Sequence, residues 1–243
     1  MTLALPIINL GNLYANNLQV SWVSTTTLSM AAGQCRDSTD SVDLTLSTAT
    51  TINGAVNGVN GLDTGSLANN TWYAVYIIGS SLNSQATATL LSTSATAPAL
   101  PSNYDCFRRI GWVLTDGSAH FLAVNIYGNS NQRIYMWDAI ATELSAAGNA
   151  SYTDVDLSSS VPSTSTLVHL NWKLVPNTAG NLSLLRKNGS SSTTNPQLTG
   201  SVAAQPNAGF LTMNCDSSQI IEYKTASASD ALTLYVIGFT DFI

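Results

Sequence analysis

The feature that most constrains the fold is a series of short β-prone runs separated by turn-forming residues. The run at 72–78 is uninterrupted, aromatic and β-branched, and it is too short for a typical helix, so it is expected to be a central strand. The run at 107–114 is expected to pair beside it. Residues 53–65 carry several Asn-Gly pairs, which predict a succession of tight turns and not a phosphate-binding loop. This pattern predicts an all-β fold.

Further runs of the same kind continue along the chain. In the first half they lie at 18–23, 27–31, 41–46 and 86–92, followed by a hairpin of 119–126 with 132–137. In the second half they lie at 153–157, 166–174, 181–186, 209–213, 219–223 and 231–238. Even spacing of short strands with turn signals indicates β-sandwich or jelly-roll-like domains. The segment 139–147 is the one helix that the sequence favours, as a connector between domains.

The length of 243 residues allows one large β domain or two smaller ones, and two are preferred. We expect an N-terminal β domain at 18–147 and a C-terminal β-sandwich, jelly-roll-like domain at 148–243. Residues 1–17 are expected to form an extended arm, because Pro6 and the Asn-containing pairs oppose regular structure. Such an arm is suited to docking onto another protein.

The composition points to a protein that assembles. Charged residues make up only 9% of the chain, against about 25% in typical soluble domains, while hydrophobic residues make up 44%. A surface of hydroxyl and amide groups costs little to desolvate, which favours extensive subunit contacts. The net charge is −6 and the eight Lys and Arg residues are scattered, so nucleic acid is not expected as a partner.

Cys35, Cys106 and Cys215 are far apart and lack CxxC spacing, so they are expected to be buried free thiols. This state fits assembly in a reducing cytoplasm. The first residues lack a basic region and are interrupted by Pro6, which argues against a signal peptide. Because no run approaches the ~18 apolar residues of a membrane helix, no membrane insertion is expected and the protein should be soluble when made.

Three sets of polar side chains could support catalysis or metal binding, namely Asp37, Asp40 and Asp43, then Asp154 and Asp156, and finally His120 and His169. The first set does not match a calcium loop, so turn capping is the favoured interpretation. The second lies on one face of a strand, which does not control the ~5 to ~9 Å separation that glycoside hydrolysis needs. Both histidines are isolated, and no Gly-x-Ser-x-Gly elbow is present. We therefore expect no catalytic residue, cofactor or metal.

The five tryptophans allow two interpretations. Their aromatic faces could form a platform on which sugar rings stack. All of them, however, fall in predicted strands beside apolar neighbours, where core or subunit-interface positions are favoured. The residues concerned are Trp22, Trp72, Trp112, Trp137 and Trp172.

The adjacent Arg108 and Arg109 are expected to face opposite sides of their strand. The inward one needs a carboxylate such as Asp63 or Asp105, and our hypothesis is that it clamps the turn segment 53–65 to the strand. The corner at 104–109 is expected to face a neighbouring subunit. The candidate subunit interface consists of Tyr104, Phe107, Arg108 and Arg109.

With these residues, the chain resembles a recurring family of virion proteins from tailed bacteriophages and prophages. The resemblance covers most of residues 18–137. It rests on five ordered segments, 22–28, 31–37 (Ala-Ala-Gly-Gln-Cys-Arg-Asp), 58–65, 72–76 and 100–111. Residues 161–162 and 234–239 are in turn similar to β-sandwich or jelly-roll modules of phage fibre, tail and head-decoration proteins.

The resemblance implies a non-enzymatic structural component of the virion that is assembled in the bacterial host cytoplasm, commonly as a homotrimer, with no catalytic residues. Its partners would be further copies of itself, other virion proteins and the host envelope. Three locations on the virion stay open, namely the tail fibre, the neck or tail attachment region, and the capsid surface. The lack of a long coiled-coil or β-helical shaft favours a short tail fibre or a virion-surface fibre or decoration subunit. The alternative is a carbohydrate-binding module that reads host cell-surface glycans, and a weaker one is a polysaccharide depolymerase.

Overall fold

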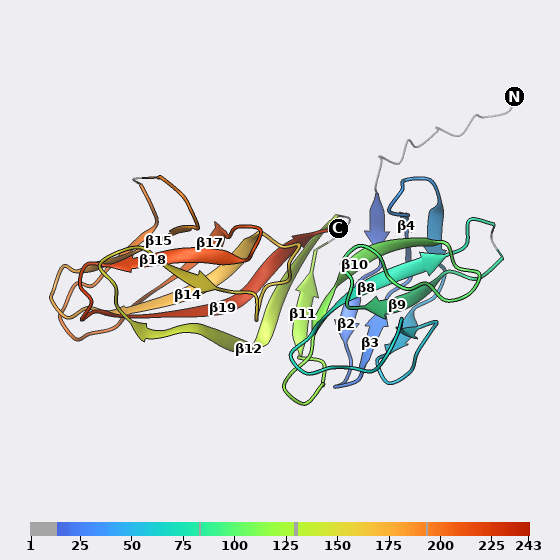
Figure 1. The fold of residues 1–243 in the computed structure, drawn as a ribbon, viewed down its shortest axis with the longest axis horizontal. Helices are drawn as coiled ribbons and strands as arrows, with labels where there is room; N and C mark the ends of the chain where they lie inside the picture. Colours follow the sequence, from blue (N-terminus) through green and yellow to red (C-terminus); the bar gives the residue numbers. More distant parts are fainter. Residues whose placement is uncertain (1–13, 83, 129–130, 193) are drawn as a thin grey trace, which may run out of the picture. The chain divides into compact units, whose positions relative to one another are not determined.

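The computed structural model describes residues 14–82, 84–128, 131–192 and 194–243. Every helix or strand in these residues is a β-strand, so the predicted all-β class is confirmed (Figure 1). The described residues form two compact units. The first unit comprises 14–67, 73–111 and 131, and the second comprises 68–72, 112–128 and 132–243. The predicted boundary at residue 147 falls within the second unit, at the end of a strand.

The strands of the first unit belong to three sheets. One sheet has the order β1-β4-β5, with β1 (Ala15–Asn17), β4 (Gly33–Arg36) and β5 (Asp43–Leu46). A second has the order β2-β3-β6, with β2 (Val20–Trp22), β3 (Thr27–Met30) and β6 (Thr50–Asn53). The third has the order β10-β8-β9-β7, with β10 (Cys106–Leu114), β8 (Trp72–Gly79), β9 (Ala88–Ser92) and β7 (Gly61–Leu62).

Strand β8 is the centre of the four-stranded sheet, as predicted. It lies between β10 and β9, so the expected pairing of the two runs is also confirmed. From Tyr73 onward every residue of β8 is buried, on both faces of the sheet. A strand covered on both faces reads as a continuous apolar run, which explains why this stretch lacks the alternation seen elsewhere.

The segment before β8 is a series of turns, as its Asn-Gly pairs predicted. Gly58 (φ 90°), Asn60 (φ 60°) and Gly65 (φ 74°) take the left-handed conformation that these residue types adopt at low cost. The Asn60 carboxamide oxygen accepts hydrogen bonds from both the backbone N–H and the hydroxyl of Thr89, at 3.0 Å each. The turns therefore hold the short strand β7 against β9, with which it pairs in parallel.

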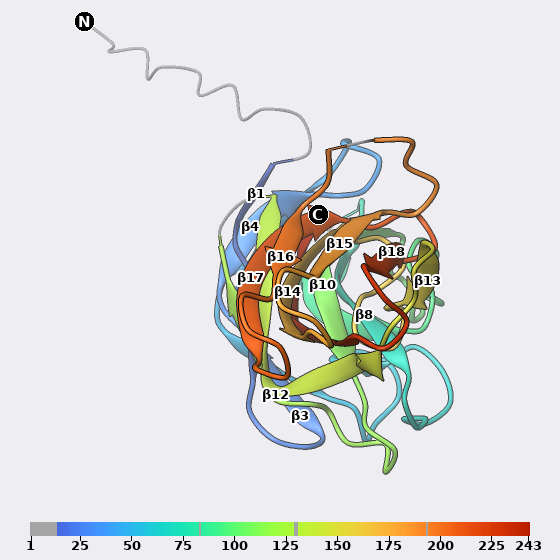
Figure 2. The ribbon, with the colours of Figure 1, turned by 90° about the vertical axis from the view of Figure 1, so that its left-hand side faces the viewer.

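The second unit contains two sheets. The larger has the order β11-β12-β19-β14-β17, with β11 (Val124–Tyr127), β12 (Gln132–Ala147), β19 (Ala231–Phe242), β14 (Leu167–Val175) and β17 (Asn207–Asn214). The smaller has the order β13-β18-β15-β16, with β13 (Thr153–Asp156), β18 (Ile220–Thr225), β15 (Leu182–Lys187) and β16 (Gln197–Thr199). In Figure 2, β17 and β14 lie on the left and β18 and β13 on the right. This arrangement is consistent with the predicted β-sandwich, and jelly-roll connectivity stays a prediction.

The core of the second unit lies between its two sheets. Alternate residues of β14 are buried, and the central strand β19 adds large apolar side chains to the same layer. The smaller sheet contributes residues from β13, β15 and β18. The buried apolar side chains are Val168, Leu170, Trp172, Leu174, Leu232, Leu234, Val236, Phe239, Val155, Leu185, Ile221 and Tyr223.

The helix expected at 139–147 is wrong, because these residues form the second half of β12. Ala, Glu and Leu dominate this segment and favour a helix locally. Pairing with β19 overrides that preference, and the register between the two strands shifts after Met136, Thr142 and Leu144. Such irregularities let a long strand bend while it stays paired.

The arm predicted at residues 1–17 is described only in its last residues. Residues 1–13 of the predicted arm lie outside the described residues, whereas Ala15–Asn17 forms β1 and pairs with β4. Strand β16 was not expected in its Ser- and Thr-rich surroundings. The three cysteines are free and buried, as predicted. No helix in the described residues is long and apolar enough to span a membrane.

Gly238 lies at the point where β19 pairs with both β12 and β14. A Cβ atom at this position would collide with the backbone oxygen of Tyr135 and press on the sulfur of Met136. We therefore expect Gly238→Ala to lower the free energy of unfolding of the second unit by about 1–3 kcal/mol. Thermal unfolding followed by tryptophan fluorescence measures this loss. Gly117→Ala is the control, since its Cβ would meet only ordinary contacts; equal stability of the two variants would contradict the prediction.

Candidate interaction surfaces

One face of the larger sheet in the second unit carries several exposed, large apolar side chains among polar ones. Residues of β14 that alternate with the core point to this face, and the register places Asn171 opposite Phe210 on β17 and Tyr235 on β19. The same face includes side chains of β12 and β11, since Tyr127 pairs with Ile134 and Ile134 pairs with Thr240. We call this surface the outer sheet face. Its most exposed apolar members are Phe210 (76%), Phe242 (60%), Tyr127 (55%) and Ile140 (53%).

Two hollows on the outer sheet face are lined mainly by apolar groups. One of about 380 Å³ lies over β12, β19, β14 and β17, and is lined by Ile140, Asn171, Lys173, Ala208 and Tyr235. Another of about 260 Å³ is lined by Ile134, Met136, His169, Leu170, Phe210, Leu211, Thr212 and Ile237. The Asn171 Oδ1 atom is buried without a hydrogen-bond partner among the described residues. A buried acceptor without a partner is costly, and this atom lies below the accessible surface of the face.

His169 lies within the outer sheet face and joins three strands. Its Nδ1 is 2.8 Å from the hydroxyl of Thr212 on β17, and its Nε2 is 2.9 Å from the hydroxyl of Thr240 on β19. Burial lowers the pKa of His169, because the charged imidazolium loses solvation. The neutral imidazole is therefore the form that this surface holds.

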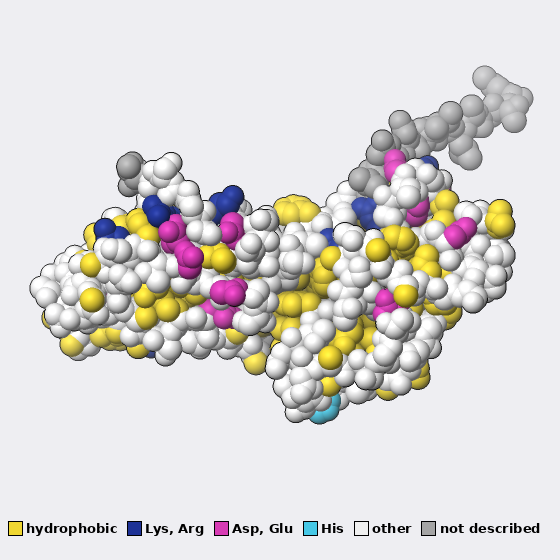
Figure 3. All heavy atoms as spheres, in the orientation of Figure 1, with side chains coloured by type: hydrophobic (Ala, Val, Ile, Leu, Met, Phe, Trp, Pro, Cys, Tyr) yellow, Lys and Arg dark blue, Asp and Glu magenta, His cyan; other side chains and the backbone are white. Residues whose placement is uncertain are grey.

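Charged side chains are sparse on the surface that Figure 3 shows, which is mostly white backbone and uncharged side chains with yellow apolar patches. In the second unit a compact charged group lies on the smaller sheet. The Arg186 guanidinium bonds both oxygens of Glu222, at 2.7 and 3.0 Å, and its centre lies 3.6 Å from the ring centroid of Tyr152. These charges are paired within the unit, so they stabilise the smaller sheet without indicating a charged partner.

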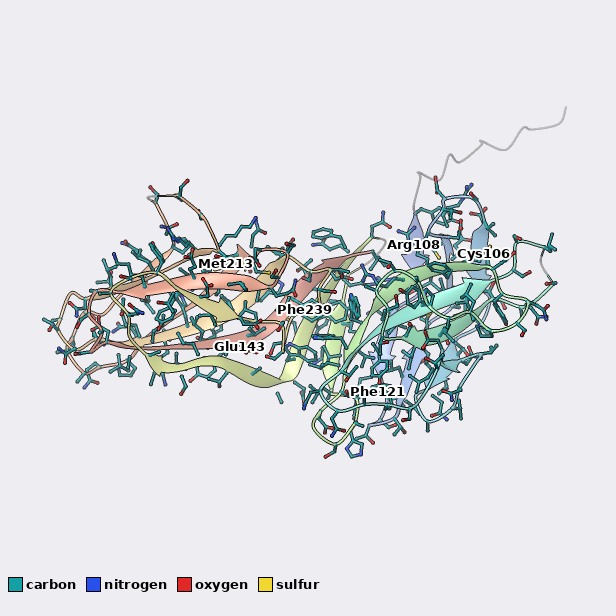
Figure 4. The ribbon with its side chains drawn as sticks, in the orientation of Figure 1. Cys106, Arg108, Phe121, Glu143, Met213 and Phe239 are labelled. Atoms are coloured by element: carbon teal, nitrogen blue, oxygen red, sulfur yellow. The ribbon has the colours of Figure 1, made fainter. Side chains whose placement is uncertain are left out.

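The predicted orientation of the paired arginines is confirmed in the first unit. Arg108, which Figure 4 labels, is 4% exposed, whereas Arg109 is half-buried. Burial lowers the pKa of Arg108. The Arg108 guanidinium donates to the backbone oxygen of Arg36 at 3.4 Å and so connects β10 to β4. This contact is to β4 and not to segment 53–65, and the expected clamp on that segment stays a prediction.

Tyr104 and Phe107, the other members of the predicted interface, are also partly covered within the first unit. The Tyr104 hydroxyl donates to the backbone oxygen of Ala86 at 3.0 Å. The Phe107 ring meets Tyr76 edge to face, with centroids 5.7 Å apart. All four residues of the predicted interface therefore have intramolecular contacts, and their role in contacts between subunits stays a prediction.

Three of the five tryptophans gather in the second unit. Trp72 lies at the centre of this group, with ring centroids 6.2 Å from Trp112, 5.8 Å from Trp137 and 5.7 Å from Phe239. Tyr135 stacks on Phe239 at 4.3 Å, nearly parallel (Figure 4 labels Phe239). Trp172 is separately buried in the sandwich core, and Trp22 is 37% exposed in the first unit. The sequence alone identified these tryptophans as candidates, but it contained no signal that would predict which of them lie next to one another.

The carboxylates of the candidate cation loop make structural contacts instead. Asp37 is buried and accepts hydrogen bonds from the backbone N–H groups of Thr39, Ser41 and Val42 and from the Thr39 hydroxyl. Burial opposes its ionisation, but these hydrogen bonds together lower the pKa of Asp37. Asp43 forms an ion pair with Arg36 at 2.8 Å. No group of three or more metal-binding side chains occurs in the described part of the chain.

The remaining candidates do not come together into a site. Asp154 and Asp156 are both exposed on one face of β13, as expected, and the Asp156 carboxylate accepts the backbone N–H of Ser158. His120 is exposed, with its Nδ1 3.7 Å from the Asp116 carboxylate in the turn that precedes Phe121. These contacts are typical of capped turns and solvated strand faces.

No family model matches this sequence, and no curated protein matches it either. Among solved structures, the chain is similar to the structure of infectious bursal disease virus Gx strain, with 12% identity over 98% of this chain and 69% of that chain and a TM-score of 0.24. It is also similar to a Bacillus thuringiensis Cry1Da tryptic core variant, with 8% identity over 96% of this chain and 50% of that chain and a TM-score of 0.22. Both TM-scores are too low to establish a shared fold, so neither similarity contributes to the argument on function.

The two adjacent arginines provide a matched pair of variants. We expect Arg108→Ala to lower the free energy of unfolding of the first unit by about 2–3 kcal/mol, because it removes a buried side chain and its hydrogen bond to Arg36. Arg109→Ala, at a half-buried position, should cost less than about 1 kcal/mol. Urea unfolding followed by circular dichroism measures the free energy of unfolding of both variants. Equal losses would show that Arg108 does not connect the two strands.

The lowered pKa of His169 makes the stability of the second unit depend on pH. The unfolded chain takes up a proton near the ordinary histidine pKa of about 6.5, while the folded chain resists it. Stability is therefore fully present above that pH and declines as the pH falls through the ordinary and then the lowered pKa of His169.

Thermal midpoints measured from about pH 8 to about pH 5 test this dependence. In the His169→Gln variant, which does not titrate, the part of the decline due to this residue should disappear. A variant that loses stability as steeply as the parent protein would show that other groups are responsible.

Proposed function

We propose that this protein is a non-enzymatic structural component of a tailed-bacteriophage virion, a short tail-fibre or virion-surface fibre or decoration subunit that assembles as a homotrimer. In this proposal the outer sheet face of the second unit contacts a neighbouring copy, and residues 1–17 dock onto another virion protein. The observation that carries the assembly is the exposed apolar surface formed by Phe210, Phe242, Tyr127 and Ile140.

The size of the exposed apolar side chains supports this role. Full transfer of one large apolar side chain from water into a protein interior contributes about 1.5–3 kcal/mol. Association costs about 4–15 kcal/mol in lost freedom, so a stable contact needs several such side chains acting together. The outer sheet face supplies four large apolar side chains that are more than half exposed. Four further apolar side chains on this face are half-buried, namely Ile134, Met136, Tyr235 and Ile237. Monomeric proteins rarely leave a continuous surface of this kind uncovered.

The composition supports the same role. Only 9% of the residues are charged, and the uncharged polar groups that replace them lose little when a subunit contact excludes water. The bacteriophage origin and the location on the virion rest on the resemblance of residues 18–137 to virion proteins. An outer surface of the assembled protein would be available to the host envelope. The alternative role, a carbohydrate-binding module, is favoured by a hollow that Trp72 and Trp137 line in the second unit.

Mass spectrometry and antibody labelling of purified particles test the location. The proposal requires that the protein be present in intact particles in many copies, in a number divisible by three, and that antibodies label the tail or the particle surface. Its absence from particles, with accumulation only in the host cell, would contradict a structural role in the virion.

A single substitution that introduces a negative charge tests the role of the outer sheet face in assembly. We expect Phe210→Asp to reduce assembly at least tenfold, because a carboxylate buried in an apolar contact is costly. Val202→Asp is the matched control, since Val202 is 56% exposed in the same unit but lies between β16 and β17 and outside this face. Light scattering after size-exclusion chromatography reports the mass of each variant. An unchanged mass for Phe210→Asp would remove this face from the assembly.

A further inference from the structure

A hollow of about 380 Å³ lies next to the Trp72 group in the second unit. Trp137, Ala139 and Ala141 alternate along β12 and line it, while Ile140, between them in sequence, faces the outer sheet face. The hollow and the surface proposed for assembly are therefore on opposite sides of β12. A ligand in the hollow would not compete with a neighbouring copy on that face.

The apolar wall of the hollow includes two indole rings beside leucine and alanine side chains. Trp72 and Trp137 both line it, with ring centroids 5.8 Å apart and planes inclined by 51°. The indole N–H of Trp72 donates to the backbone oxygen of Ser158 at 3.0 Å, and that of Trp137 donates to Ser160 at 3.2 Å. The loop 158–160 therefore fixes both rings. Because their N–H groups are already bonded, the rings offer a ligand mainly carbon surface.

The polar wall of the hollow offers mostly acceptors. The hydroxyls of Ser159 and Ser160 both donate to Oε1 of Glu143 on β12, Ser159 at 2.7 Å (Figure 4 labels Glu143). Their protons are thereby committed, and their oxygens remain able to accept. The exposed Asn70 adds an amide that can donate as well as accept. A ligand that carries several hydroxyl donors matches this wall.

The charge of the hollow discriminates among such ligands. Asp116 is one of its lining residues, and the Glu143 carboxylate lies directly behind the serines. No Lys or Arg is among the described residues that line it. A ligand with a carboxylate, sulfate or phosphate group would meet only negative charge here, so an uncharged ligand is favoured.

We propose that this hollow binds a neutral sugar unit, whose ring carbons lie against Trp72 and Trp137 and whose hydroxyls donate to the serine and asparagine oxygens. Ligand pockets in proteins have volumes of about 300–1,000 Å³ and combine an apolar lining with a few oriented polar groups, and this hollow fits that description. The proposal goes beyond assembly and is independent of it.

The test measures binding of simple sugars to the full chain. Saturation-transfer difference NMR is recorded with D-glucose, D-galactose, D-mannose and N-acetyl-D-glucosamine, each at about 10 mM, and with D-glucuronate and D-galacturonate under the same conditions. At least one neutral sugar should receive saturation through its ring protons, with binding at least tenfold tighter than that of either uronate. No transfer to any neutral sugar, or equal binding of the uronates, would overturn the proposal.

Two variants connect the binding to this hollow. Ala139→Phe fills it, and Ser159→Ala removes an acceptor without adding bulk; each should weaken binding of the neutral sugar at least tenfold. Ala203→Phe, at an exposed position outside the hollow, is the control and should bind as the parent protein does. If both variants fold and bind normally, the hollow is not the site. Light scattering on the same samples reports assembly separately, so a failure of this proposal is distinguishable from a failure of the proposed function.

Discussion

The second unit depends on β19, the central strand of its larger sheet. The inward residues of β19, such as Leu234 and Phe239, pack into the sandwich core, and its outward residues Tyr235 and Ile237 lie on the outer sheet face beside polar side chains of β14. The smaller sheet covers one side. On the other side Tyr235 and Ile237 are half-buried beside the exposed Phe210 and Ile140, which makes the outer sheet face the surface that we expect a partner to cover.

Much of the fold follows from the sequence, because strand periodicity and turn chemistry are local. The run at 72–78 and the Asn-Gly turns before it have the structures that their residues predict. The segment 139–147 does not, because its helix-forming residues are paired with β19, and that pairing is set by residues about ninety positions away. That one of Arg108 and Arg109 faces inward was predictable from alternation, whereas which of the two it is, and its contact with β4, were not.

The interaction surfaces were less predictable, since they depend on which strands become neighbours. Phe210 and Phe242 are far apart in the sequence and share a face only through the order β12-β19-β14-β17. The hollow beside Trp72 depends in the same way on loop 158–160 reaching the tryptophans of β8 and β12. Alternation along β12 separates these two surfaces, so one chain can present both a contact for assembly and a pocket for a ligand.

A cryo-EM reconstruction of the assembled full chain tests the central claim most directly, because it shows which side chains lie between neighbouring copies. Our account predicts that Phe210, Phe242 and Ile140 are buried against a neighbouring copy of the 25.5 kDa chain. An assembly in which the outer sheet face remains in contact with solvent would contradict it.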